Sequence, residues 1–99
     1  MRKVVKKDIV SDIYDKVNGV NKSIVKNIID YFIDELNKYL LMDEDIIIEL
    51  RKFGVIEKKR INKDFVINPF TKEKIKIKKI YKIKYKPSKM IKKGLIKYL

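Results

Sequence analysis

The chain has 99 residues and a formal net charge of +13, and its apolar share of 45% is typical of a folded protein. This length fits one domain, and no apolar run approaches the about 20 residues that span a bilayer. Cysteine and histidine are both absent, which removes the thiolate metal ligands and the commonest general base. We therefore expect no enzymatic activity, cofactor, metal, membrane association or small-molecule substrate.

The charge is distributed unevenly along the chain. Residues 1–50 contain eight Lys and Arg against ten Asp and Glu, whereas residues 51–99 contain eighteen against three, which gives −2 and +15. A general bias toward lysine would act on both halves alike, so it does not explain this difference. A positive field concentrated in half of a small domain is typical of polyanion binders. The alternative is a lysine-rich surface that only serves solubility.

The first part of the chain is predicted to form two helices. Asp8 is suited to cap a helix whose apolar residues recur at spacings of three and four up to Val17. Asn18-Gly19 ends it, and Asn21 then caps a longer helix with a wide apolar stripe over residues 24–40. The apolar surface of this stripe is larger than the short first helix can bury. We therefore expect a sheet, a second copy of the chain, or both to pack on it.

The period then changes to that of β-strands. Residues 46–50 and 55–61 are predicted to pair around a tight turn at 51–54 in which Gly54 relaxes the backbone restriction. A third strand is predicted over residues 75–85, with Tyr81, Ile83 and Tyr85 on one face and lysines on the other. Because Lys79 interrupts the apolar face of this strand, we expect a bulge near residues 78–79.

Two further segments complete the chain. Residues 62–74 form a long excursion around Asn68-Pro69, where a proline within a strand-like run indicates an edge, a turn or a tip. Residues 87–99 are predicted as a short helix that starts at Pro87 or Ser88. Its inward-facing residues are predicted to be Met90, Ile91, Leu95 and Tyr98.

Three short motifs occur along these predicted elements. They are "KFG" at residues 52–54, "INPFTKE" at 67–73 and "YKPSK" at 85–89. They resemble the GFG-like turn, the RNPxTGE arm tip and the FKPGK strand-to-helix junction of the HU/IHF family of bacterial nucleoid DNA-bending proteins. The order and spacing of the motifs fit as well, and the resemblance spans nearly the whole chain.

The resemblance implies an α+β fold in which residues 1–99 form one DNA-binding domain and an intertwined homodimer. An αα-hairpin at 1–42 would dimerise, residues 46–61 and 75–85 would form a three-stranded antiparallel saddle sheet, 62–74 a β-ribbon arm and 87–99 a short C-terminal helix. The protein would bind double-stranded DNA through the minor groove with low sequence specificity, and would bend and compact it. It would reside in the cytoplasm, associated with the nucleoid.

The resemblance also implies which residues contact DNA. Pro69 would be the intercalating wedge, since its rigid apolar ring has no N–H to leave unpaired. The other arm contacts would be Ile67, Asn68, Phe70, Thr71, Lys72, Lys74, Lys76 and Lys78. The phosphate contacts of the saddle would be Lys6 or Lys7, Lys58, Arg60, Lys84, Lys86 and Lys89. The dimer core would include Ile28, Phe32, Leu36 and Phe53.

Three tip residues depart from the family pattern. Ile67 replaces the arginine before Asn-Pro, which removes a cation but leaves apolar bulk. Lys72 replaces the glycine after the threonine, so the tip turn is open to a different shape. Phe70 is an additional apolar neighbour of the proline that either extends the wedge or packs on the arm.

Two other function classes are weighed against DNA bending. An RNA-binding or ribosome-associated basic protein would share the charge, but it has no need for a proline at a ribbon tip. A nucleic-acid enzyme would need an acidic metal cluster. The one dense acidic run, Asp43-Glu44-Asp45, is better explained as a helix cap or a solvated turn.

Overall fold

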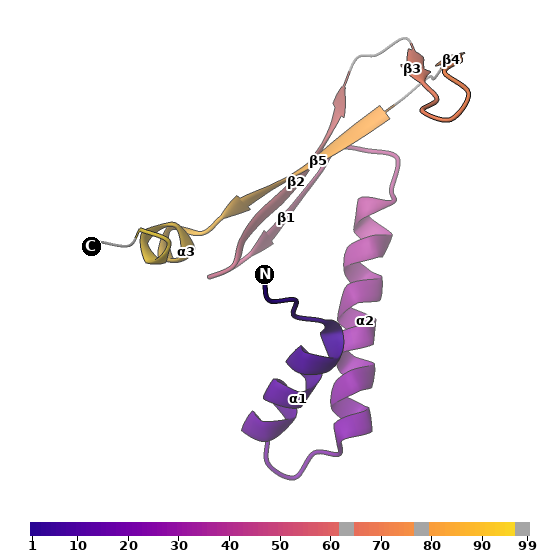
Figure 1. The fold of residues 1–99 in the computed structure, drawn as a ribbon. Coiled ribbons are helices and arrows are strands. Elements are labelled where there is room, and N and C mark those ends of the chain that lie inside the picture. Colours follow the sequence, from indigo (N-terminus) through magenta and orange to yellow (C-terminus); the bar gives the residue numbers. More distant parts are fainter. Residues whose placement is uncertain (62–64, 77–79, 97–99) are drawn as a thin grey trace. The chain divides into compact units, whose positions relative to one another are not determined.

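The structure is a computed structural model that describes residues 1–61, 65–76 and 80–96 (Figure 1). Its elements are α1 (Lys6–Lys16), α2 (Lys22–Leu40), β1 (Ile46–Leu50), β2 (Gly54–Ile61), β3 (Phe65–Ile67), β4 (Lys74–Lys76), β5 (Ile80–Pro87) and α3 (Lys89–Gly94). They divide between two compact units, Met1–Leu41 and Met42–Leu99. The element order confirms the predicted α+β fold. The predicted bulge at residues 78–79 lies outside the described residues.

The first unit is an αα-hairpin of α1 and α2 (Figure 1). The two helices are capped differently. Asn21 accepts a hydrogen bond from the Ser23 backbone N–H at 2.9 Å, which confirms it as the cap of α2. The prediction for α1 is wrong by one turn, because the helix begins at Lys6 with Val5 as its cap residue. Asp8 instead lies in the first turn and accepts a hydrogen bond from the Val5 backbone N–H at 2.9 Å.

The core of this unit is small. Val10 of α1 and Val25 of α2 are the buried hydrophobic residues in the described part of the chain, each 4% exposed. In contrast, Ile28 and Phe32 of α2 remain 59% and 50% exposed. The wide apolar stripe predicted for α2 is therefore present, and α1 does not bury these two side chains.

The second unit contains a three-stranded antiparallel sheet in the order β1-β2-β5. Residues that pair directly across antiparallel strands lie on the same face. The pairing therefore defines an apolar face that carries Ile46, Ile48, Leu50, Ile56, Lys58, Arg60, Tyr81, Ile83 and Tyr85. The opposite, charged face carries Ile47, Glu49, Val55, Glu57, Lys59, Ile61, Ile80, Lys82, Lys84 and Lys86.

The turn between β1 and β2 requires glycine at its end. Gly54 has φ +141°, and a Cβ built there would lie 2.2 Å from the Lys86 carbonyl oxygen of the neighbouring strand. Next to it, the Phe53 ring stacks on Tyr85 with centroids 4.9 Å apart, and the Tyr85 hydroxyl donates to the Phe53 carbonyl oxygen at 2.8 Å. The turn is thus fixed to β5 by both backbone fit and an aromatic contact.

The start of helix α3 agrees with one of the two predicted starts, Pro87 or Ser88. Ser88 is its N-cap, and the Ser88 hydroxyl accepts a hydrogen bond from the Ile91 backbone N–H at 3.3 Å. The predicted inward face is not formed by the single chain, because Met90 and Leu95 are 61% and 69% exposed and only Ile91 is half-buried. Tyr98 lies outside the described residues.

Candidate nucleic-acid interface

The hairpin β3–β4 ends in a turn closed by one asparagine. The last ladder pair is Ile67 with Lys74. Beyond it, the Asn68 backbone N–H donates to the Glu73 carbonyl oxygen at 2.9 Å, and the Lys72 N–H donates to the Asn68 carbonyl oxygen at 2.7 Å. The backbone thereby forms a tight turn over residues 68–73.

The side chain of Asn68 adds an internal brace to this turn. Its Oδ1 accepts hydrogen bonds from the backbone N–H groups of Phe70 at 2.9 Å and Thr71 at 3.4 Å. An asparagine that bonds the backbone two residues on is a turn-specific arrangement. Asn68 thus has a structural role at the tip, in addition to the DNA contact predicted from the sequence.

Lys72 occupies the position where the family has glycine. It has φ +60°, which is the left-handed region that glycine enters most readily. The substitution therefore keeps the conformation that the turn needs, at a cost of about 1 kcal/mol of backbone strain. A lysine in this position places a cation at the tip.

The tip exposes apolar side chains. Pro69 is exposed, Phe70 is 94% exposed and Ile67 is 60% exposed. Thr71, Lys72 and Lys74 are exposed as well. Three exposed apolar residues, Ile67, Pro69 and Phe70, therefore lie in the turn or directly before it, close in the chain to exposed lysines. Of the remaining predicted arm contacts, Lys76 pairs through its backbone in β4, and Lys78 lies outside the described residues.

On the charged face of the sheet, lysines gather on β2 and β5. Lys59 lies directly opposite Lys82, an unfavourable like-charge pair, whereas Lys84 lies opposite Glu57. Lys59, Lys82, Lys84 and Lys86 are all exposed. The contacts predicted from the sequence included Lys84 and Lys86 but omitted Lys59 and Lys82. The alternation along β5 would have identified Lys82, whereas Lys59 is identified only by the pairing of β2 with β5.

Glu57 is the acidic centre of this face. Its carboxylate lies 2.8 Å from the Lys86 ammonium and 3.5 Å from that of Lys59, and its side chain is only 18% exposed. The pKa of Glu57 is lowered, first because Lys86 donates a hydrogen bond to it and then by the charge of that lysine. Two lysines of the charged face are therefore already paired within the chain.

The structure gives Lys58 a position that the sequence prediction did not anticipate. It lies on the apolar face, is only 3% exposed, and donates from its ammonium to the Met42 carbonyl oxygen. Its Nζ also lies 4.4 Å from the centroid of the Tyr81 ring. Because this ammonium is buried and used within the fold, we leave Lys58 out of the proposed set of phosphate contacts.

The acidic run 43–45 is attached to the sheet rather than being merely a solvated turn. Asp45, just before β1 begins, accepts a hydrogen bond from the Arg60 backbone N–H at 2.9 Å, beyond the outermost β1–β2 pair of Ile46 with Lys58. Asp43 accepts one from the Tyr81 hydroxyl at 2.7 Å, and this bond raises the pKa of Tyr81. The two carboxylates thus attach the acidic run to a backbone N–H near the end of β2 and to a side chain near the start of β5. Arg60 itself is exposed and lies on the apolar face.

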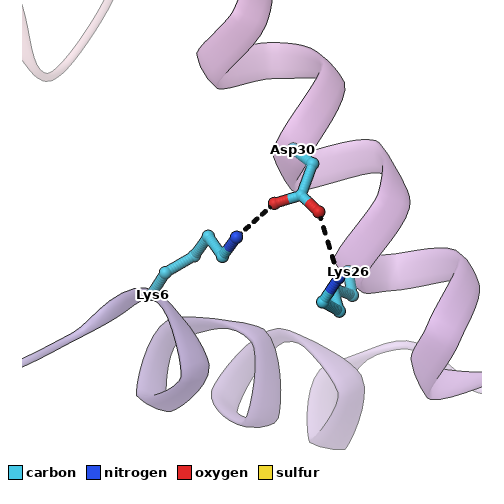
Figure 2. Close-up of polar contacts among 3 residues, drawn as sticks. All are labelled: Lys6, Lys26 and Asp30. Carbon is cyan, nitrogen blue, oxygen red and sulfur yellow. Dashed lines mark hydrogen bonds and ion pairs between the residues drawn. The ribbon is translucent and has the colours of Figure 1, made fainter.

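In the helical unit, one of the two candidate phosphate lysines is engaged by a carboxylate. Asp30 of α2 lies 2.5 Å from the Lys6 ammonium and 3.3 Å from that of Lys26 (Figure 2). The pKa of Asp30 is lowered, mainly by the hydrogen bond from Lys6. Lys7 is exposed, as is Lys89 at the start of α3. The ion pair cross-links α1 to α2.

Neither a metal cluster nor a membrane span is present among the described residues. They include no group of three or more His, Cys, Asp or Glu side chains placed to hold a metal ion. None of the helices in the described ranges is long and apolar enough to cross a membrane.

Comparison with known proteins agrees with this architecture. No match was found among curated proteins. A solved structure of HU from Anabaena in a cocrystal with DNA is similar, with a TM-score of 0.68 at 17% sequence identity. The similarity covers 93% of this chain and 97% of that one, and at this identity it concerns the fold. The profile of the family described as "Bacterial DNA-binding protein" matches residues 4–95. The chain therefore belongs to the bacterial DNA-binding protein family, which is the HU/IHF family.

Proposed function

We propose that this protein is an architectural DNA-binding protein that bends and compacts double-stranded DNA as a nucleoid-associated homodimer in the cytoplasm. The observation that carries the proposal is the tip of the β3–β4 hairpin, where exposed Pro69 stands on a braced turn beside lysines. Family membership supports the DNA partner and argues against an enzyme.

Pro69 would act as a wedge in the minor groove. A proline ring inserted between base pairs leaves no backbone N–H unpaired, and partial unstacking costs a few kcal/mol per step. Bending the DNA toward the protein would repay this cost through phosphate contacts and the release of counterions. We assign these contacts to Lys59, Lys82, Lys84 and Lys86 of the charged face, and to Arg60, Lys89 and Lys6 or Lys7.

A second copy of the chain would cover the apolar stripe of α2. Besides Ile28 and Phe32, Ile24 and Tyr31 are 50% and 66% exposed, which leaves bulky side chains in water along the helix. Phe53 is 48% exposed and Leu36 is half-buried. These residues support the dimer core predicted from the family resemblance, and the family forms homodimers.

Low sequence specificity is proposed because arginine is scarce. The chain has arginine only at positions 2, 51 and 60, and arginine is the side chain best suited to base edges and to narrow minor grooves. Lysines contact phosphates instead, and phosphates carry no direct sequence information.

Binding to matched DNA and RNA duplexes at several salt concentrations tests this function against the RNA-binding alternative. The DNA affinity is expected to fall steeply with salt, with a slope of the logarithms near −0.9 per phosphate neutralised. The DNA duplex should bind more tightly than the RNA duplex, whose wide, shallow minor groove does not suit the arm. Tighter binding of RNA, or a shallow salt slope, would contradict the proposal.

A further inference from the structure

The side chain of Phe70 is almost fully exposed at the tip of the hairpin. Of the large hydrophobic residues in the described ranges, only Met1 at the start of the chain has a greater exposed fraction than its 94%. Such exposure disfavours packing of the side chain on the described part of the arm, which is one of the two roles that the sequence left open. A phenyl ring fully in water at a ribbon tip contributes nothing to a core.

The backbone that carries this ring is nevertheless held in place. The Phe70 N–H is bonded to Asn68 Oδ1 at 2.9 Å, and the turn around it is closed by Asn68 and Lys72. Pro69 immediately before it has a fixed φ. Little backbone entropy would thus remain to be lost when the ring binds a partner. The tip lysine at position 72 is exposed, which favours an anionic partner.

The geometry points to a base of DNA as that partner. We propose that Phe70 is a second, aromatic wedge that stacks on a base at the step that Pro69 opens, a proposal that rests on the proposed function. Consecutive Cα atoms are about 3.8 Å apart, close to the roughly 3.4 Å rise between bases along one strand. A ring that follows Pro69 by one residue is therefore within reach of a base that flanks the opened step. Stacking of a base on an aromatic ring is worth roughly 5- to 150-fold in affinity by alanine substitution.

Because the chain contains no tryptophan, Phe70→Trp introduces the sole indole of the protein. Its emission is measured during titration with a DNA duplex, and it should be strongly quenched at saturation, since an indole that stacks on a base loses emission. Tyr14→Trp, near the C-terminal end of α1, is the control, and its emission should change little on titration. Unchanged emission of Phe70→Trp on saturated DNA would overturn the proposal.

A double-mutant cycle locates the ring relative to Pro69. Phe70→Ala should weaken DNA binding by roughly 5- to 150-fold, whereas Phe70→Trp should retain affinity. If both rings occupy one step, Phe70→Ala should reduce DNA affinity less in the Pro69→Ala background than it does in the wild type. Additive effects would overturn the shared step, and wild-type affinity of Phe70→Ala would overturn the wedge altogether.

The failure of this inference is distinguishable from the failure of the proposed function. If the wild type neither binds nor bends duplex DNA, the proposed function fails, and the role of Phe70 fails with it. If the wild type bends DNA and Pro69→Ala does not, while Phe70→Trp stays unquenched, only the role of Phe70 is contradicted.

Discussion

The ammonium of Lys58 lies 4.4 Å from the centroid of the Tyr81 ring, on the apolar face of the sheet. The next residue, Lys59, lies on the opposite face with a side chain that is 71% exposed. Two adjacent lysines in one strand therefore have different roles. Lys58 stabilises the contact between residue 42 and the sheet, whereas Lys59 lies on the exposed, charged face 3.5 Å from the Glu57 carboxylate.

Replacing these two lysines separately by methionine tests that division. The salt slope of DNA binding should be unchanged in Lys58→Met, because the buried ammonium touches no phosphate. In Lys59→Met it should become shallower by about 0.9 for each phosphate that the protein no longer neutralises. Affinities measured over a range of salt decide the matter, and an equal change of slope in both variants would show that Lys58 reaches DNA.

Lys58 and Lys59 also show which features of the sheet could be predicted from the sequence and which could not. Period-two alternation placed Tyr81, Ile83 and Tyr85 on one face correctly, and the turn chemistry placed Gly54 correctly. For the last helix the sequence left Pro87 and Ser88 open, and Ser88 is the cap. The run "EKKRI" has no such alternation. Because a shift of one residue moves every side chain to the other face, only the pairing of β2 with β5 separates Lys58 from Lys59.

The start of α1 was mispredicted for a related physical reason. An aspartate near a helix start satisfies free N–H groups either as the cap or from within the first turn. Asp8 takes the second role, and nothing in its neighbours distinguishes the two. Similarly, the exposed Met90 and Leu95 follow an inward pattern that one chain alone does not bury.

Gly54→Ala is expected to destabilise the fold strongly. The added Cβ would lie 2.2 Å from the Lys86 carbonyl oxygen, and φ +141° is strained for any side chain. We expect a loss of more than about 3 kcal/mol in the free energy of unfolding. Gly94→Ala is the matched control, since nothing lies within 4 Å of its Cβ position. Alanine at this helical position should raise the free energy of unfolding by up to about 1 kcal/mol. Urea unfolding of both variants compares them, and similar stabilities would refute the account of the turn.

Glu57 is expected to give the fold a pH dependence on the acid side. Its pKa in the folded state is lowered by Lys86 and Lys59. Its ion pairs therefore stabilise the protein above the ordinary glutamate pKa of about 4.3. That contribution disappears as the pH falls through the lowered value. Unfolding curves from pH 7 to 2 should show a smaller loss of stability on acidification in Glu57→Gln than in the wild type. An identical pH profile would contradict the pairing.

The stability of the protein should depend on its concentration. If a second chain covers Ile28 and Phe32 of α2, unfolding is coupled to dissociation and mass action raises the denaturation midpoint with protein concentration. Phe32→Glu would bury a charge in that contact and should produce monomer or unfolded chain. Urea midpoints at two widely separated concentrations, with sedimentation as a check, provide the measurement. A midpoint that does not move would indicate a stable monomer.

The central claim is that Pro69 bends DNA by wedging between base pairs. Energy transfer between dyes at the two ends of a duplex, measured at saturating protein, tests it most directly. The wild type should bring the ends closer and raise the transfer. Pro69→Ala should lose much of that rise, whereas Pro87→Ala, which alters the other proline of the chain, should keep it. Equal transfer in the wild type and in Pro69→Ala, with both bound, would contradict the wedge.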